Sequence, residues 1–140
     1  MSERTLVMLK PDTVARGLVG RVIQRIEDRG FRIAGLKILR LTYEQTFELY
    51  RIHEKKPFFN DLVSHITSGA VIVIVVEGLN AITAMRQLAG STNPLEADLG
   101  SVRGTFGLNG TINAIHTADG LENAKREIGL FFGLDEIVKY

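Results

Sequence analysis

The chain has no cysteine among its 140 residues and no hydrophobic run long enough to cross a membrane. Without cysteine, a disulfide framework, a thiolate metal site and a cysteine nucleophile are all excluded. The longest apolar run, Ala70 to Val76, is far too short to span a bilayer, and the first residues lack the apolar segment of a signal peptide. We therefore expect a soluble cytoplasmic protein with no membrane partner.

An excess of charge of one sign is also missing. The chain has 17 Lys and Arg residues and 16 Asp and Glu residues, which leave a net charge of +1. This balance argues against a protein that depends on a basic surface to bind nucleic acid, although arginines could still gather locally in a pocket. The sequence motifs of a P-loop and of a dinucleotide-binding fold are absent too.

Histidine is scarce, and its spacing does not suit zinc. The three histidines are His53, His65 and His116, and no two of them are three or four residues apart. Because cysteine is missing as well, we do not expect a zinc site. We interpret His53 and His65, which lie in polar helical segments, as surface residues.

The sequence does contain a clear succession of apolar strands and amphipathic helices. The order predicts a ferredoxin-like α+β fold, β-α-β-β-α-β, with a four-stranded antiparallel sheet and helices on one face. We expect residues 1–140 to form a single domain, with a long loop before the last strand. The expected elements are a strand at 5–9, a helix from Leu18 to Gly30, a strand at 31–41 with a bulge near Leu36, a helix begun by a Thr42–Gln45 capping box, a helix at 60–67, a central strand at 70–76 and a helix from Asn80 to Gly90.

The segment 91–111 has no sustained hydrophobic period. It contains Pro94 and several glycines, so we expect a loop without regular structure. A loop of this length in a compact domain is uncommon and usually functional. Thr92 and Arg103 lie in it and are candidates for binding a ligand.

The stretch 113–122 predicts a histidine at a junction between a strand and a helix. A short apolar strand leads into His116, and a helix follows from Asp119, with Glu122 completing a capping box. Glu127 lies about two helical turns further on, where its carboxylate can fix the tautomer of the imidazole and leave the other nitrogen free to attack. The alternative is a histidine that merely satisfies backbone groups at a strand end.

Two more residue types are candidates for ligand contacts. Lys10 ends the first strand, where its cation can reach a ligand, although a solvated lysine is the simpler interpretation. Phe58 and Phe59 follow Pro57, and two neighbouring rings do not easily point inward together. We expect Phe59 in the core and Phe58 as a candidate for an exposed stacking surface.

Several segments together resemble the nucleoside diphosphate kinase family. The matching segments extend over nearly the whole chain in the order and spacing of that family, and they are Glu3-Arg4-Thr5-Leu6, Lys10-Pro11-Asp12, Arg16-Gly17-Leu18-Val19-Gly20, Lys56-Pro57-Phe58-Phe59, Thr67-Ser68-Gly69, Gly90-Ser91-Thr92-Asn93-Pro94, Arg103-Gly104 and Asn113-Ala114-Ile115-His116. The resemblance implies a homo-oligomer, a hexamer or a tetramer. It also implies transfer of the terminal phosphoryl group of a nucleoside triphosphate, typically ATP, to a nucleoside diphosphate through a phosphohistidine.

The resemblance also implies roles for particular residues. His116 would be the nucleophile and Glu127 would orient its ring, with Lys10 and Tyr50 completing the catalytic group. Mg²⁺ is expected on the nucleotide phosphates, with no metal ligand from the protein. Phe58 would stack on the base, which predicts broad base tolerance. The residues expected to hold the phosphates and the sugar are Lys10, Arg86, Thr92, Arg103 and Asn113.

The chain departs from the common family pattern at Thr105, Thr117, Ala118 and the loop 108–112. Ala118 lacks the hydroxyl usual at its position, so we expect a hydrogen bond near Glu127 to be absent. None of these departures removes the nucleophile or a phosphate ligand. We expect an altered rate or affinity, and not an inactive enzyme.

Two other functions are compatible with parts of the sequence. RNA-recognition domains share the β-α-β-β-α-β order, and the segment 103–107 superficially resembles their aromatic motif. However, that motif belongs on a central strand, whereas here the central strand is wholly aliphatic. The second alternative is a catalytically impaired nucleotide-binding regulator, which only the altered neighbours of His116 favour.

Overall fold

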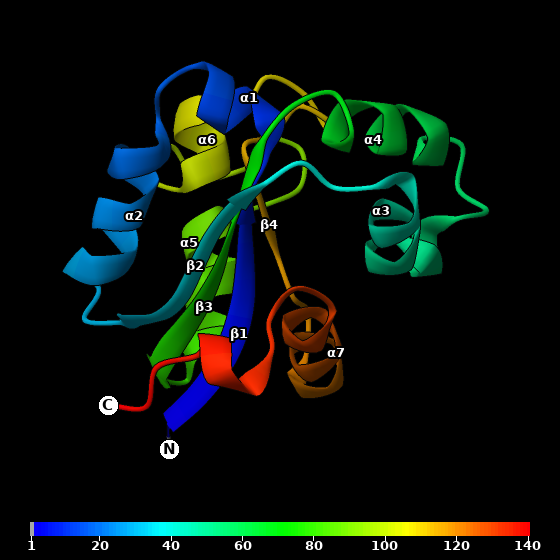
Figure 1. The fold of residues 1–140 in the computed structure, drawn as a ribbon. Helices are drawn as coiled ribbons and strands as arrows, with labels where there is room; N and C mark the ends of the chain where they lie inside the picture. Colours follow the sequence, from blue (N-terminus) through cyan, green and yellow to red (C-terminus); the bar gives the residue numbers. More distant parts are fainter. Residues whose placement is uncertain (1) are drawn as a thin grey trace.

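Residues 2–140, the part of the chain that the computed structural model describes, form a four-stranded antiparallel sheet in the order β2-β3-β1-β4 (Figure 1). The strands are β1 (Ser2–Leu9), β2 (Arg32–Leu39), β3 (Val71–Leu79) and β4 (Ile115–Thr117). Strand β1 pairs with β3 from Ser2 to Leu9. The expected ferredoxin-like α+β fold is therefore confirmed, with the apolar β3 inside the sheet.

Helices cover both faces of the sheet, so the prediction of helices on one face is wrong. Figure 1 shows α2, α5 and α6 on one side, and α3, α4 and α7 on the other. The helices are α1 (Pro11–Ala15), α2 (Val19–Asp28), α3 (Tyr43–Leu49), α4 (Phe59–Ile66), α5 (Ala81–Ala89), α6 (Val102–Phe106) and α7 (Leu121–Phe131), with short 3₁₀ turns η1 (Arg51–His53) and η2 (Leu134–Glu136).

The two faces of the sheet build two hydrophobic cores. Val7 and Ile74 pack with α2 and α5, whereas Met8 and Val73 pack with α3, α4 and α7. Because alternate residues of a strand point to opposite faces, the apolar runs of β1 and β3 need cover on both sides. The β-α-β-β-α-β order accounts for α2 and α5 alone, and the further helices bury the opposite face.

Two predicted helix boundaries are confirmed. The Thr42 Oγ1 accepts from the Gln45 N–H at 3.0 Å, and the Gln45 Oε1 accepts from the Thr42 N–H at 2.9 Å, which completes the capping box of α3. Gly30 follows α2 with φ +86°, the left-handed conformation that glycine adopts most readily.

Two other helix starts differ from the prediction. Helix α7 begins at Leu121 after Gly120, and its amino terminus has no side-chain cap, so the Asp119–Glu122 capping box is wrong. Instead, the Asp119 Oδ1 accepts from the Asn123 Nδ2 at 2.5 Å. Asn80 does precede α5, but its side chain makes no capping bond. The Ile82 N–H donates to the Glu3 carboxylate of β1 at 3.2 Å, so this helix end is satisfied from a distant strand.

The segment 91–111 contains the short helix α6, so the prediction of a loop without regular structure is wrong. Ser101 Oγ accepts from the Gly104 N–H at 3.0 Å and caps this helix. A Cβ on Gly104 would lie 2.0 Å from the carbonyl oxygen of Asp98, so only glycine fits this close approach. Five residues with a glycine at their centre give too little hydrophobic period to be recognised in the sequence.

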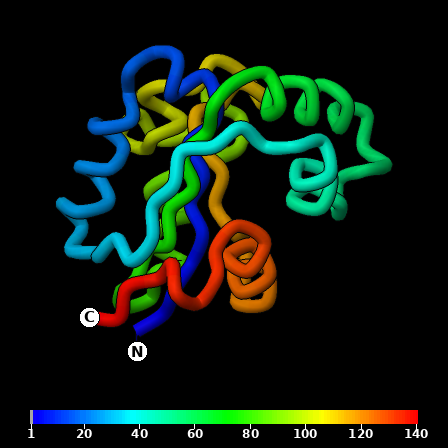
Figure 2. The backbone as a smooth tube through the Cα atoms, viewed as in Figure 1, coloured from blue at the N-terminus to red at the C-terminus, as the bar shows by residue number. Residues whose placement is uncertain are grey.

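The irregularity in β2 lies between Ile33 and Gly35, slightly before the bulge expected near Leu36. The carboxy-terminal tail runs beside this strand, and Figure 2 shows the two termini at the same end of the molecule. The Val138 N–H donates to the Ala34 carbonyl at 2.8 Å, so the tail satisfies a backbone group at the bulge. Across residues 2–140, none of the helices combines the length and the apolar character that a membrane crossing requires.

Candidate active site

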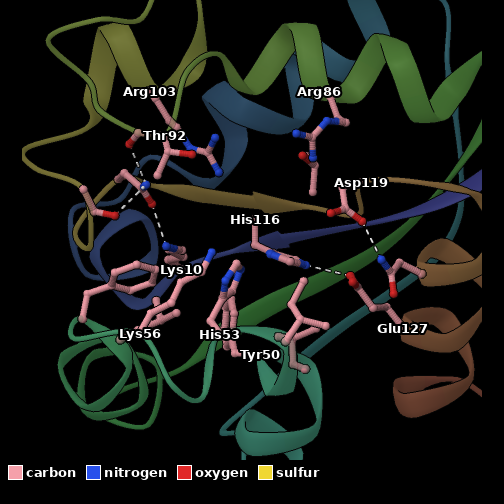
Figure 3. Close-up of a pocket in the computed structure, with 18 residues that line it drawn as sticks. Lys10, Tyr50, His53, Lys56, Arg86, Thr92, Arg103, His116, Asp119 and Glu127 are labelled. Carbon is pink, nitrogen blue, oxygen red and sulfur yellow. Dashed lines mark hydrogen bonds and ion pairs between the residues drawn. The ribbon is translucent and has the colours of Figure 1, made fainter.

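One pocket of about 370 Å³ collects all nine of the site residues predicted from the sequence. They come from the residues that follow β1 and α3, the α3–α4 connection, α5, the segment 92–113, β4 and α7 (Figure 3). The predicted residues that line the pocket are Lys10, Tyr50, Phe58, Arg86, Thr92, Arg103, Asn113, His116 and Glu127.

His116 lies at the centre of the pocket on β4, with Glu127 of α7 behind it. The His116 Nε2 is 2.7 Å from the Glu127 Oε1, and the two side chains are 15% and 4% exposed. Because an ionised carboxylate only accepts, Nε2 carries the proton and the Nδ1 lone pair is free. The ring of Tyr50 packs edge-on against the imidazole, with 5.3 Å between ring centroids. The imidazole is therefore held in one tautomer and one orientation.

The second oxygen of Glu127 has a weaker partner. Its Oε2 lies 3.8 Å from a guanidinium nitrogen of Arg126, beyond hydrogen-bond range. The buried Ala118 provides no hydroxyl, in keeping with the expectation that a hydrogen bond near Glu127 is absent. Glu127 thus holds His116 through one oxygen, with an electrostatic contribution from Arg126.

Lys10 and Asn113 form a polar network along one wall. The Lys10 Nζ donates to the Asn113 Oδ1 at 2.6 Å and to the Thr111 carbonyl at 3.2 Å. The Asn113 Nδ2 in turn donates to the Thr92 carbonyl at 2.9 Å. Burial lowers the pKa of Lys10 to about 7, with Arg103 lowering it further and Asp12 opposing the shift. An anion bound beside Lys10 would favour its charged form.

Arg103 is held from the other side by backbone carbonyls. Its two terminal nitrogens donate to Gly90 at 2.8 Å and Ile115 at 2.9 Å. Burial lowers the pKa of Arg103 to about 10, with Tyr50 opposing the shift and Arg86 adding to it, so the guanidinium stays charged at neutral pH. Burial also raises the pKa of Tyr50, with the charge of Glu127 adding to it, so its hydroxyl remains a hydrogen-bond donor.

Several buried polar atoms in the pocket have no partner within the described chain. They are the Nε of Arg103, the hydroxyl of Tyr50 and the Nδ1 of His53. Leaving buried polar groups unpaired costs free energy, so sites of this kind are typically completed by a ligand or water. The pocket therefore offers unused hydrogen-bonding groups beside four lysine and arginine side chains, a combination that suits a phosphate-bearing ligand.

Phe58 and His53 lie at the mouth of the pocket. Phe58 is 41% exposed while Phe59 is 5% exposed, so the prediction of one ring out and one ring in is confirmed. His53 lines the pocket, with its ring 5.7 Å from that of Phe58, so interpreting it as a surface residue was wrong. Burial lowers the pKa of His53, and Lys56 and His116 add to the shift. Its position three residues after Tyr50, on the same side of a helical turn, was a usable signal.

His65 is also not a simple surface residue. Its Nε2 lies 2.9 Å from the Asp12 Oδ1, and its side chain is 15% exposed. These two residues are separated by 53 positions in the chain, so no local pattern predicts their contact.

The protein alone offers few ligands for a metal. Within residues 2–140, no three His, Cys, Asp or Glu side chains gather in a way that could hold a metal ion. Two carboxylates line the pocket: Glu127 is bonded to His116, and Asp119 is bonded to Asn123. A metal ion in this pocket would therefore need oxygen ligands from a bound molecule.

Known proteins with similar sequences are nucleoside diphosphate kinases. A family model described as nucleoside diphosphate kinase matches residues 3–137. The nucleoside diphosphate kinase of Archaeoglobus fulgidus is 51% identical over 138 residues, which cover 99% of this chain and 91% of that protein. The corresponding protein of Methanothermobacter thermautotrophicus is 50% identical over 138 residues, which cover 99% and 92%.

Solved structures give the same result. A halophilic nucleoside diphosphate kinase from Halobacterium salinarum in complex with CDP aligns with a TM-score of 0.96 at 44% identity, covering 100% of this chain and 93% of that chain. The nucleoside diphosphate kinase of Aquifex aeolicus aligns with a TM-score of 0.95 at 40% identity, covering 99% and 100%. Both sequence and fold are therefore similar over nearly the full length.

Proposed function

Because this chain belongs to the nucleoside diphosphate kinase family, a family of phosphotransferases, we propose that it moves phosphoryl groups by a ping-pong mechanism through His116. The donor is a nucleoside triphosphate, typically ATP, and the acceptor is a nucleoside diphosphate. The observation that carries the proposal is the 2.7 Å contact between His116 Nε2 and the buried Glu127, which leaves Nδ1 free in a cationic pocket.

In the first half-reaction, the lone pair of His116 Nδ1 attacks the terminal phosphorus of the triphosphate. A bond forms between nitrogen and phosphorus, and the bond to the bridging oxygen breaks, so the diphosphate leaves with the electron pair. The ring becomes positively charged, and the carboxylate of Glu127 stabilises it through the Nε2 proton. In the second half-reaction, a terminal oxygen of another nucleoside diphosphate attacks the same phosphorus, and the nitrogen–phosphorus bond breaks.

The cations of the pocket balance the charge of the phosphates. Lys10, Arg86 and Arg103 face a polyphosphate that carries three to four negative charges, and little further covalent chemistry is needed from the protein. Thr92 and Asn113 supply hydrogen bonds to the phosphates and the sugar, while the Tyr50 hydroxyl donates beside His116. Together these groups hold the terminal phosphoryl group of the donor in line with His116.

We propose Mg²⁺ as the accompanying ion, bound mainly by the nucleotide phosphates. The pocket fits this arrangement, because its free groups are cations and hydrogen-bond donors and its two carboxylates are already hydrogen-bonded. When bound, the ion would neutralise phosphate charge, and Asp119 is the pocket carboxylate not bonded to His116 that would hold one of its water ligands.

The base is proposed to stack on the exposed ring of Phe58. Stacking recognises the face of a base and not its hydrogen-bonding edge, and it contributes roughly 1–3 kcal/mol for any base. We therefore propose broad base tolerance. Residues 1–140 are proposed to act as one domain in a cytoplasmic homo-oligomer, a hexamer or tetramer.

Steady-state kinetics test this proposal. Initial rates with ATP and GDP should give parallel double-reciprocal lines, because the first product leaves before the second substrate binds. His116→Ala should lower kcat at least about 10³-fold while nucleotide affinity changes little. The kcat/KM values for GDP, CDP and UDP should agree within about a hundredfold. Intersecting lines, or normal turnover by His116→Ala, would contradict the phosphohistidine.

A further inference from the structure

The chain enters the nucleophile strand through a strained turn at Ala114. Ala114 has φ +76°, a left-handed value that residues with a side chain rarely adopt. The Ile115 N–H donates to the Asn113 carbonyl across it at 2.9 Å. A three-residue turn with this φ is the strained form of the γ-turn. Such a conformation persists only where the surrounding structure holds it.

Residues just after β1 hold both peptide groups of Ala114. The Lys10 N–H and the Thr13 Oγ1 donate to the Ala114 carbonyl at 2.9 and 2.7 Å. The Asp12 Oδ2 accepts from the Ala114 N–H at 3.0 Å, in a fully buried hydrogen bond. Hydrogen bonds to both the carbonyl and the N–H of Ala114 therefore hold the turn. Of these three residues, Asp12 is the one whose side chain accepts from the Ala114 N–H.

The turn lies between two residues of the pocket. Asn113 precedes it, His116 follows it by two residues, and both line the pocket. Strand β4 is only three residues long, so its pairing with β1 and the turn at Ala114 together fix the backbone of His116. A change at Ala114 would therefore shift the nucleophile relative to its substrate.

Asp12 is itself oriented by His65 of α4. The His65 Nε2 lies 2.9 Å from the Asp12 Oδ1, with the two side chains 15% and 7% exposed. Because an ionised carboxylate only accepts, the His65 Nε2 carries the proton and donates it. One oxygen of Asp12 thus binds His65, while the other binds the Ala114 N–H.

We propose that His65 is a positioning residue for phosphoryl transfer, acting through Asp12 and the Ala114 turn on the placement of His116. This inference rests on the proposed function. His65 is not among the residues that line the pocket, so its loss removes no contact with the nucleotide. The expected effect is on the rate of transfer and not on affinity, because a small misplacement of a reacting group is costly to the rate.

Single-turnover phosphorylation of the protein by ATP and Mg²⁺ tests this role. His65→Phe and His65→Ala both remove the donor, and we expect each to be about tenfold slower, with the nucleotide Kd within about twofold of the original. His65→Gln keeps an N–H donor near the position of Nε2 and should recover at least about half of the rate. Ser64→Ala, on an exposed neighbouring position of α4, is the matched control and should be unchanged.

Hydrogen exchange of the Ala114 amide gives a second measurement that needs no turnover. The amide should exchange at least about tenfold faster in His65→Phe and His65→Ala than in the original protein, because Asp12 is no longer oriented. It should stay protected in His65→Gln and Ser64→Ala. His65→Phe introduces a phenyl ring at position 65, whereas His65→Ala introduces none. Agreement between the two variants therefore assigns the effect to the missing donor and not to the packing of the ring.

Two results would overturn the inference. One is transfer by His65→Phe and His65→Ala at the original rate with unchanged Ala114 exchange. The other is an equal loss of rate and of thermal stability in all three His65 variants, which would mean that His65 only supports the fold. An inactive original protein would overturn the proposed function first, before any variant is compared, and this inference with it.

Discussion

Lys10 is nearly fully buried beside the groups proposed to bind phosphate, and burial with the nearby Arg103 lowers its pKa to about 7. Its neighbours Asn113 and Thr111 accept its hydrogen bonds but carry no charge. Asp12 is the nearby negative charge that favours the charged lysine, and an incoming polyphosphate would add more. The side chain is thus neutral in most molecules at pH 8 until the nucleotide arrives.

We therefore predict that nucleotide binding at pH 8 takes up close to one proton per site. The anion favours the charged lysine, whereas the phosphates themselves are already ionised at this pH because their last pKa is near 6. Calorimetric titrations with ADP in two buffers of different ionisation enthalpy measure the uptake. Lys10→Met should abolish it, and the uptake should decline as the pH falls from 8 to 7, because more of Lys10 is then charged before binding. Equal uptake by Lys10→Met at pH 8 would contradict this account.

The same residue affects stability with a definite sign. The ordinary pKa of lysine is 10.5, and the folded value is about 7, so the unfolded chain binds the extra proton between these pH values. The contribution of Lys10 therefore makes the free energy of unfolding rise as the pH increases from 7 towards 10.5. Below pH 7 Lys10 is charged in both the folded and the unfolded protein, so the folded protein bears the full free-energy cost of burying that charge.

Among the elements, α3 links a local sequence signal to the site. Its capping box fixes where the helix begins, and Tyr50 at its end packs against His116. The Thr42 Oγ1 satisfies a helix N–H that would otherwise lack a partner. A weakened cap should loosen the first turn of α3, at the opposite end of the helix from Tyr50.

Thr42→Ala should lower the free energy of unfolding by about 1 kcal/mol. For a chain of this size, that corresponds to a fall in Tm of about 3 °C, measured by thermal denaturation. Phosphoryl transfer at 25 °C should be unaffected. Thr42→Ser keeps the hydroxyl and is the control. If Thr42→Ser loses as much stability as Thr42→Ala, the capping bond is not the cause.

The elements that the sequence predicts well are those whose information is local. The strand into His116, the lysine that ends β1 and the left-handed Gly30 each follow from a pattern of a few residues. Glu127 was also expected behind His116, from helical spacing within one element. Local patterns thus indicate Lys10, His116 and Glu127, whereas Tyr50, Arg86 and Asn113 follow only from the resemblance to the family.

The features that were missed depend on contacts between distant parts of the chain. Glu3 satisfies the start of α5 from 79 residues away, and His65 meets Asp12 across 53 residues. Helix α6 is too short to show a period and is held by Ser101 and by the close approach at Gly104. The packing of α3, α4 and α7 on the second face of the sheet likewise depends on tertiary contacts, which the order of the elements does not predict.

At the scale of the whole molecule, the sheet brings the site together. His116 of β4 pairs with Met8 of β1, and Lys10 directly follows β1, so the two side chains reach the pocket from adjacent strands. Helix α7 supplies Glu127 from one side, and the α3–α4 connection closes the pocket with Phe58. Residues from opposite ends of the sequence therefore converge on one centre, as Figure 3 shows.

The surface offers support for the proposed homo-oligomer. Strand β2 forms one edge of the sheet, and its Leu36 and Ile38 side chains are 51% and 72% exposed. Leu95 and Leu99 of the 91–111 segment are 92% and 86% exposed. Apolar side chains exposed at a sheet edge or on a surface segment favour contact with another chain.

In the proposed mechanism, a phosphoryl group rests on His116 after the first nucleotide leaves and before the second reacts. The measurement is to mix the protein with γ-labelled ATP and Mg²⁺, without acceptor, and to follow acid-labile label on the protein before and after GDP is added. We predict label on the original protein that moves into GTP, and none on His116→Ala. Tight nucleotide binding without any label would contradict this mechanism and favour a nucleotide-binding regulator.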